Sequence, residues 1–254
     1  MVTTDLHGFT FNHFLVTIIT LACIVPMVTN AAPLPGYQEK WRNPCEIPSP
    51  TFEPYETTNA QKSSVLQDLL LNLQVAENVI SDLKMEYRTH RVAGRVSNGS
   101  CVSSLENNLD NVYRHVDGFP DLAPYFLSRN FLAICENIST TFLHDYKILV
   151  PVMIFLEETI EEDYQNNNAT YFYQLTELHN ALKGVMCKFH QIEQRCGAEE
   201  QTLDATELIH NYKVSPNYDP RERDYLLIRD TGVLVRALHG RYDNCLTLFR
   251  KISS

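Results

Sequence analysis

The sequence predicts an all-α fold, an up-up-down-down four-helix bundle, from three observations. Apolar residues recur at steps of three and four along four long segments, which is the period of one helix face. Only 9 glycines and 12 prolines occur among 254 residues, few for a protein of many strands and tight turns. The joins between the four segments are unequal in length, and join lengths predict the order of helices in a bundle.

The first long helix is predicted to begin near Asn59 and to end before Gly94, where a helix C-cap favours glycine. No proline or glycine interrupts residues 57 to 93. At 1.5 Å per residue, a helix of about 30 residues is about 45 Å long. Its predicted buried face consists of Val65, Leu69, Leu73, Ala76, Ile80, Leu83 and Tyr87.

A shorter helix is predicted over Cys101–Asp117, and a second long helix starts at 124 or 129 and runs to Glu162. Pro151 stands inside this second helix and is expected to kink it or divide it, because proline removes a backbone hydrogen bond. The acidic run at its end, residues 157 to 163, is interpreted as a solvated face.

The third long helix is predicted from Ala169 to Arg195, followed by Gly197. Residues 197 to 220 are interpreted as a connecting stretch with a weak apolar cluster around Tyr212. The fourth helix is predicted from 221 to 252, where the helical period persists through two glycines that each cost about 1 kcal/mol.

The joins measure about 30, about 6 and about 25 residues in chain order. A short join forces its two helices to be antiparallel, whereas a long join can return the chain to the end from which it came. The predicted order is therefore up-up-down-down, with two long crossover loops and a short extra helix in the first crossover.

The amino-terminal part resembles a secretion signal. An apolar run at 14–25 ends at Pro26, and Thr29-Asn30-Ala31 supplies small residues for a cleavage site. The run is shorter than the roughly 20 residues that span a bilayer. We therefore predict a signal peptide at 1–31, a proline-rich arm at 32–58 and the bundle at 59–254, in a secreted chain without membrane insertion after signal removal.

The cysteine count agrees with an oxidising compartment. Beyond the signal the chain carries Cys45, Cys101, Cys135, Cys187, Cys196 and Cys245. Six cysteines predict three disulfides with 15 connectivities open. We expect Cys45 to pair with Cys196, since both are predicted at the same end of the bundle, although other pairings remain open. Acceptor sequons for N-glycosylation begin at Asn98, Asn137 and Asn168.

Charge and motifs exclude several classes of function. The formal net charge is −10, which disfavours contacts with nucleic acid phosphates. Cys187 and His190 have a spacing that suits a metal, but a cysteine of an exported chain is expected to form a disulfide. The sequence contains no zinc-protease, serine-hydrolase or phosphate-loop motif. We predict no enzyme, no metal and no cofactor, and we interpret the basic pair at Arg88 and Arg91 as a chance protease site.

The last helix resembles helix D of the long-chain class I helical cytokines, most closely the leukaemia inhibitory factor and ciliary neurotrophic factor branch. The likeness rests on 226–238 and 242–254, with 181–186 and 191–193 in the third helix adding to it. The insect Unpaired cytokines are long-chain bundles of the same general kind. The resemblance implies a ligand that brings together single-pass receptor chains at the cell surface and triggers Janus-kinase-type signalling. The acidic charge and the sequons favour a monomer.

In that branch, a Phe-x-x-Lys pair at the start of helix D contacts a receptor chain. The matching positions here are Leu226 and Arg229, so the ring is missing and Arg replaces Lys. Exposed faces of the first and third helices are expected to contact one receptor chain. The first crossover and the start of the fourth helix are expected to contact another.

A secreted helical carrier of a small apolar ligand is the alternative. The spacing of Cys187 and Cys196 matches one found in six-cysteine carriers such as the insect odorant-binding proteins. The close Cys-x3-Cys pair of those carriers is absent.

Overall fold

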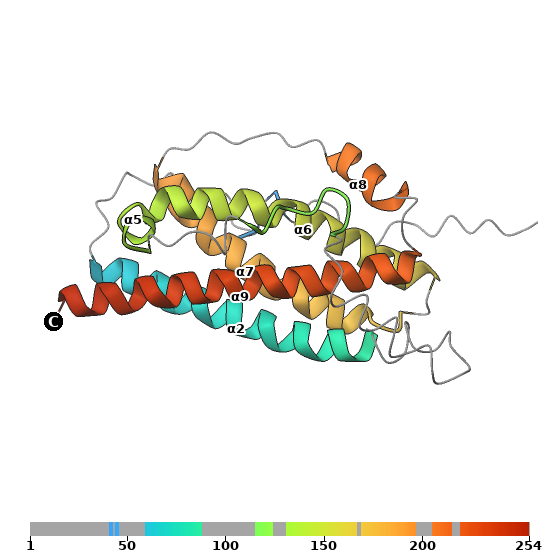
Figure 1. Ribbon diagram of the computed structural model, residues 1–254, viewed down its shortest axis with the longest axis horizontal. Coiled ribbons are helices and arrows are strands. Elements are labelled where there is room, and N and C mark those ends of the chain that lie inside the picture. The colour runs from blue at the N-terminus through green and yellow to red at the C-terminus, as the bar shows by residue number, and fades with distance from the viewer. Residues whose placement is uncertain are drawn as a thin grey trace, which may run out of the picture. The chain divides into compact units, whose positions relative to one another are not determined.

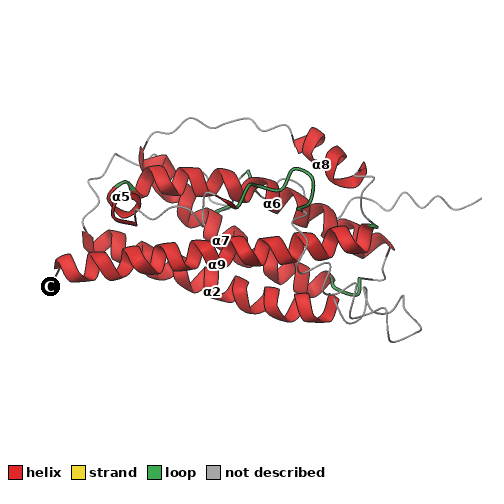
Figure 2. Cartoon of the chain, in the orientation of Figure 1, coloured by secondary structure: helices red, strands yellow, loops and turns green. Residues whose placement is uncertain are grey.

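The structure is a computed structural model that places helices and loops (Figures 1 and 2). The chain divides into two units, Met1–Pro33 and Leu34–Ser254, and all described residues belong to the second unit. The described residues are 41–42, 44–45, 59–87, 115–123, 131–166, 169–196, 205–214 and 219–253. Within these ranges Figure 2 shows helices and loops only, so the all-α prediction is confirmed. The predicted signal peptide, like most of the arm, lies outside the described residues.

Four of the described helices are long. The helices are α2 (Asn59–Tyr87), α5 (Phe131–Glu136), α6 (Ile138–Asn166), α7 (Phe172–Cys196), α8 (Ala205–Val214) and α9 (Pro220–Ser253). The four long ones match the four predicted segments to within a few residues, except that the second is divided into α5 and α6.

Helix α2 packs against α7 and α9 and runs antiparallel to both. Tyr87 at the end of α2 donates to Asp224 near the start of α9, with 3.1 Å between the oxygens. Gln174 near the start of α7 donates to Glu86 at the end of α2 over 3.0 Å. The end of α2 therefore lies beside the starts of α7 and α9.

Helix α6 is likewise antiparallel to α7 and α9. The ring of Phe142, near the start of α6, lies 5.1 Å from that of Phe189 and 5.0 Å from that of Tyr242, which stand in the second halves of α7 and α9. At the other end, Arg223 of α9 pairs with Glu162 of α6. These contacts place the start of α6 beside the ends of α7 and α9.

In α2 the buried residues follow the predicted periodicity, whereas in α6 burial extends beyond one face of the helix. In α2 the residues Leu66, Leu69, Leu73 and Leu83 are fully buried. In α6 the whole run 152–156 is buried, all around the helix. A helix buried on all faces has neighbours on all faces, and here α7, α8 and α9 all contact α6.

The division of the second helix occurs at Asn137 and not at Pro151. Helix α5 ends at Glu136, α6 begins at Ile138, and α6 continues through Pro151 to Asn166. Of the two outcomes expected at Pro151, a kink or a division, the division does not occur, because α6 is one helix from Ile138 to Asn166.

The start of α7 is set by the turn before it. Ala169 has a φ of 56°, outside the helical region. Asp163 accepts a hydrogen bond from the Tyr171 amide at 2.8 Å with its side chain, and from the Ala169 amide at 3.1 Å with its carbonyl. The carboxylate thus satisfies an amide at the start of α7, as a capping residue does.

Two crossover segments differ from expectation. The predicted connecting stretch contains a helix, α8, whose Tyr212 is fully buried. The predicted helix over Cys101–Asp117 lies mostly outside the described residues, and positions 115 to 117 are not helical. Gly118 has a φ of +82°, and a Cβ there would stand 3.2 Å from Phe155, so this turn requires glycine.

The arm before α2 is attached to the bundle by Cys45, as expected, but its partner is Cys187 and not Cys196. The prediction failed because Cys196 lies nine residues further along α7, about 13 Å at 1.5 Å per residue. Trp41 is 6% exposed, and its carbonyl accepts a hydrogen bond from Tyr146 at 3.0 Å. A second disulfide joins Cys135 of α5 to Cys245 of α9.

The two disulfides indicate an oxidising compartment, since such bonds are rare where thiols are kept reduced. Among the described helices, none is both long enough and apolar enough to cross a membrane.

Candidate functional site

The outer face of α2 carries a stripe of exposed apolar side chains. Leu71, Val75 and Met85 are 66%, 40% and 63% exposed. Their spacings of four and ten residues place them on one side of the helix. Leu, Val and Met are residue types that are usually buried in protein cores. Three of them exposed on one outer face mark a surface suited to contact with another molecule.

Three polar residues, Asn78, Ser81 and Asp82, are exposed between Val75 and Met85. Near Leu71 the stripe adjoins the surface of α7. Lys188 of α7 pairs with Asp68 of α2 at 2.9 Å, and Asp68 lies one turn before Leu71. The two helices approach closely here, because a Cβ at Gly184 would stand 2.7 Å from the Asn72 side chain. Tyr173, at the start of α7, is 80% exposed. We call Leu71, Val75, Met85, Tyr173 and the surface between them the α2–α7 face.

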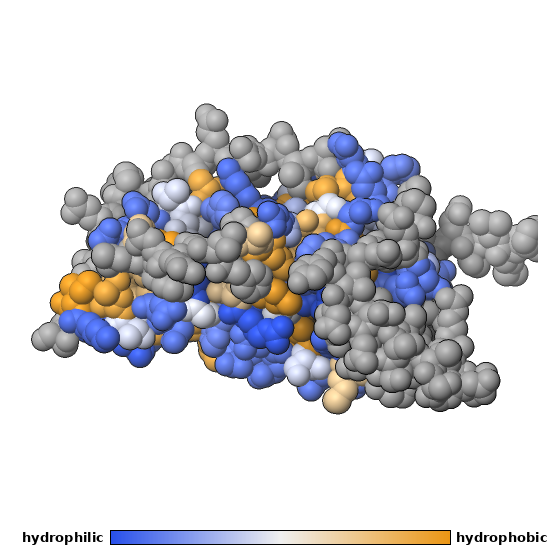
Figure 3. Space-filling view, viewed as in Figure 1, coloured by the Kyte–Doolittle hydropathy of each residue, from blue (hydrophilic) through white to orange (hydrophobic). Residues whose placement is uncertain are grey.

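The view in Figure 3 shows how mixed the surface is elsewhere. Over α9 and α2, hydrophilic and hydrophobic residues alternate, and hydrophobic residues gather where the carboxyl end of α9 lies. Ile252, near that end, is 62% exposed.

The two positions matched to the cytokine receptor pair lie in the interior. Leu226 is 1% exposed and Arg229 is 8% exposed. The Arg229 Nε donates to Asp230 Oδ1 over 2.8 Å, and His115 of the first crossover lies 3.0 Å from Oδ2 of the same carboxylate. The start of α9 is therefore covered, and the predicted receptor role of Leu226 and Arg229 does not coincide with an exposed surface.

A buried carboxylate joins four helices at one end of the bundle. Asp224 of α9 accepts hydrogen bonds from Tyr87 of α2 at 3.1 Å and from Tyr212 of α8 at 3.2 Å. Tyr212 also lies 2.7 Å from the hydroxyl of Thr159 in α6. We call this group the Asp224 centre.

The guanidinium of Arg223 completes the Asp224 centre. Its Nε and Nη2 lie 3.1 Å and 2.8 Å from Asp224 Oδ1, and its Cζ lies 4.2 Å above the Tyr212 ring. Tyr212 in turn stacks on Phe155, with ring centroids 4.6 Å apart. One side chain of α8 thus contacts α6 and α9 and attaches α8 to the bundle.

Burial sets the protonation of this centre. Desolvation raises the pKa of Asp224 above its ordinary value of 3.8, and the attraction of Arg223 only partly offsets it. Burial also raises the pKa of Tyr212 well above 10.0, with the charge of Asp224 adding to the rise. Tyr212 therefore remains a neutral hydrogen-bond donor at physiological pH.

The substitution Asp224→Asn tests this pKa. Because the folded-state pKa lies above the unfolded value, the folded state binds more protons between the two values, and stability falls as pH rises through that window. We expect the difference between the urea midpoints of Asp224→Asn and the wild type to change in favour of Asp224→Asn as pH rises above the ordinary carboxyl pKa of 3.8 and through the raised pKa of Asp224. A difference between the two midpoints that stays constant with pH would contradict the raised pKa.

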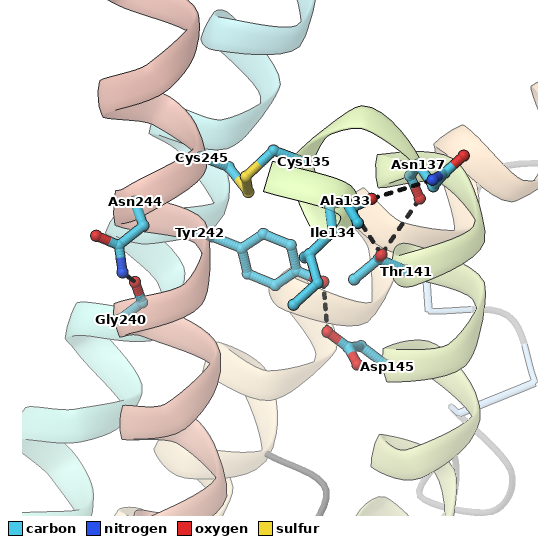
Figure 4. The surroundings of a disulfide bond; sticks show 10 residues. All are labelled: Ala133, Ile134, Cys135, Asn137, Thr141, Asp145, Gly240, Tyr242, Asn244 and Cys245. Atoms are coloured by element: carbon cyan, nitrogen blue, oxygen red, sulfur yellow. Dashed lines mark hydrogen bonds between the residues drawn. A yellow bond between two sulfur atoms is a disulfide. The ribbon is translucent and has the colours of Figure 1, made fainter. Parts of the chain in front are cut away.

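A second buried carboxylate, Asp145 of α6, lies near the opposite end (Figure 4). Arg241 Nη1 lies 2.9 Å from each of its oxygens, and the Tyr242 hydroxyl donates to it. His144 Nδ1 lies 3.2 Å from it. The Cys135–Cys245 disulfide lies beside this group in Figure 4.

The acidic end of α6 is not a solvated face, so that interpretation was wrong. Glu157 lies 3.0 Å from His179 of α7, Glu158 pairs with Lys213 of α8, and Asp163 is 1% exposed. Together with the Glu162–Arg223 pair, these contacts connect the acidic residues of α6 to three neighbouring helices. Each partner helix carries a basic residue at the contact, but the acidic run itself does not indicate which residues it meets.

The structure describes some of the remaining candidate metal-site and modification residues. Cys187 forms a disulfide, and His190 stacks near Tyr146 with centroids 5.9 Å apart, so the pair is not a metal site. Among the described residues no group of three metal-ligating side chains occurs. Asn137 is exposed. Several predicted positions lie outside the described residues: Asn98, Asn168, Cys101, the Cys196 side chain and the site at 88–91.

Comparison of the chain with family models, with curated proteins and with solved structures finds no match.

Proposed function

We propose that this chain is a secreted helical signalling ligand of the long-chain cytokine kind, with its four long helices in up-up-down-down order. The ligand binds cell-surface receptor chains, brings them together and triggers Janus-kinase-type signalling. It has no chemistry of its own.

The helix pairings support the topology. Helix α2 is antiparallel to α7 and α9, and α6 is antiparallel to the same two helices. Two parallel helices followed by two that run the other way satisfy all four relations. Long crossovers, with α8 within the second, connect the parallel pairs.

The observation that carries the functional proposal is the exposed apolar stripe on the α2–α7 face. Interfaces gain most of their affinity from a few apolar and aromatic anchors. Leu71, Val75 and Tyr173 provide such anchors, and Asp68 and Lys188 provide a polar rim. The carrier alternative needs an interior cavity, whereas rings of Phe142, Phe189 and Tyr242 occupy the space between α6, α7 and α9.

The test measures saturable binding of the labelled full chain to cells of its own organism. We expect Leu71→Glu/Val75→Glu to weaken binding by about 30-fold or more, because burying two uncompensated charges at a hot spot costs about 2 kcal/mol or more. The matched control is Thr140→Glu/Lys147→Gln on the exposed face of α6, which changes the net charge by the same amount. Equal loss in both variants, or no loss in the first, would contradict the assignment of this face.

A further inference from the structure

We infer that Asn137 carries an N-linked glycan, and that this glycan marks the side of the bundle turned away from the receptor. The second half of this inference rests on the receptor binding of the proposed function, and the first half rests only on its secretion. Asn137-Ile138-Ser139 is an acceptor sequon. Its Asn is exposed, although Cys135 and Ile138 on either side are 1% and 4% exposed.

The folded structure accommodates the sugar without losing a hydrogen bond. Asn137 Nδ2 donates one of its two hydrogens to the Ala133 carbonyl at 3.1 Å, which leaves the other hydrogen to be replaced. The Asn137 carbonyl accepts from the Thr141 amide and hydroxyl, so the start of α6 does not use the side-chain amide. Figure 4 shows Asn137 on the side of α6 away from α9 and from the Cys135–Cys245 bridge.

The donor is a lipid-pyrophosphate-linked oligosaccharide of the secretory pathway. Nδ2 forms a bond to C1 of the first sugar, and the bond from C1 to the pyrophosphate oxygen breaks. The lipid pyrophosphate leaves with the electron pair, and the proton from Nδ2 passes to a carboxylate of the transferase. Cys245 follows Cys135 by 110 residues, so the acceptor reaches the transferase before its neighbouring bridge can close.

The position of Asn137 opposes the α2–α7 face. Asn137 shares the outer face of α6 with Thr140, His144 and Lys147, which are all exposed and follow at steps of three and four. Helices α2 and α6 both pack against α7 and α9, so they stand at opposite corners of the bundle. A glycan on the outer face of α6 therefore shields that side and leaves the apolar stripe of α2 open.

Peptide mapping tests the modification itself. The full chain is secreted from eukaryotic cells and treated with the amidase that converts a glycosylated Asn to Asp in heavy-oxygen water. We expect conversion at Asn137, its loss in Ser139→Ala, and no conversion at Asn78, which is exposed but in no sequon. An unconverted Asn137 in folded, secreted chain would overturn the inference.

A glycan placed on the other side tests the orientation. Val75→Asn/Glu77→Thr introduces a sequon on the stripe of α2, and Asn137→Gln removes the natural one. In the cell-binding assay, we expect Asn137→Gln to bind within about twofold of the native chain and the α2 variant to bind about tenfold or more weakly. The reverse pattern would overturn the orientation. If the native chain binds no cell, both the proposed function and the inferred orientation of the glycan are overturned. The peptide mapping still decides whether Asn137 is glycosylated.

Discussion

Replacing Asp145 by alanine is expected to destabilise the fold by about 3–5 kcal/mol, the range for breaking a buried ion pair from one side. Asp145 is fully buried, and Arg241, its partner, is 9% exposed. The substitution removes the carboxylate that Arg241 and Tyr242 share, and the largely buried guanidinium keeps its charge. The measurement is the free energy of unfolding from urea titration.

A double variant separates charge from packing. Asp145→Leu/Arg241→Met replaces both partners by apolar groups and is expected to lose much less stability than Asp145→Ala, because no charge remains buried. Equal losses in the two variants would show that packing, and not the unpaired cation, causes the effect.

Removing the Cys135–Cys245 disulfide is the second large effect that we expect. The bridge spans 110 residues and joins α5 to the last part of α9. Cross-links across loops of this size contribute about 2–5 kcal/mol, chiefly by restricting the unfolded chain in the loop-entropy model. We expect Cys135→Ala/Cys245→Ala to lose stability in this range, measured as the shift of the urea midpoint.

Reduction provides the control for this bridge. In the presence of a thiol reductant the native chain should approach the double variant, while the variant should shift only by the contribution of its other disulfides. If the oxidised native chain and the variant unfold at the same urea concentration, the bridge contributes no stability.

Helix positions were predictable because the information is local. The apolar face of α2, with Leu69, Leu73 and Leu83, follows a period that one segment shows by itself. The order of α2, α6, α7 and α9 in the chain and the lengths of their joins supported the bundle topology for the same reason. The break between α5 and α6 at Asn137 was harder to predict from the sequence, since the residues on both sides continue the helical period.

The polar interior was not predictable because its partners are distant in sequence. Tyr87 and Asp224 are 137 residues apart, and Asp145 and Arg241 are 96 residues apart. A lone Asp in a helical segment is compatible with a solvated face, so the acidic run 157–163 gave no sign of its partners in α7, α8 and α9. The contacts of Tyr212 in α8 with Thr159 of α6 and Asp224 of α9 were likewise not predictable from the weak apolar cluster alone.

The candidate site was likewise predictable only in part. The amino-acid sequence alone indicated that exposed faces of the first and third helices were available, and that Asn137 stood in a sequon. Packing decided that Leu226 and Arg229 are buried and that Leu71 and Val75 remain exposed. It also decided that Cys45 pairs with Cys187. Periodicity specifies which residues share a helix face, but only the arrangement of neighbouring helices determines which faces and which cysteines meet.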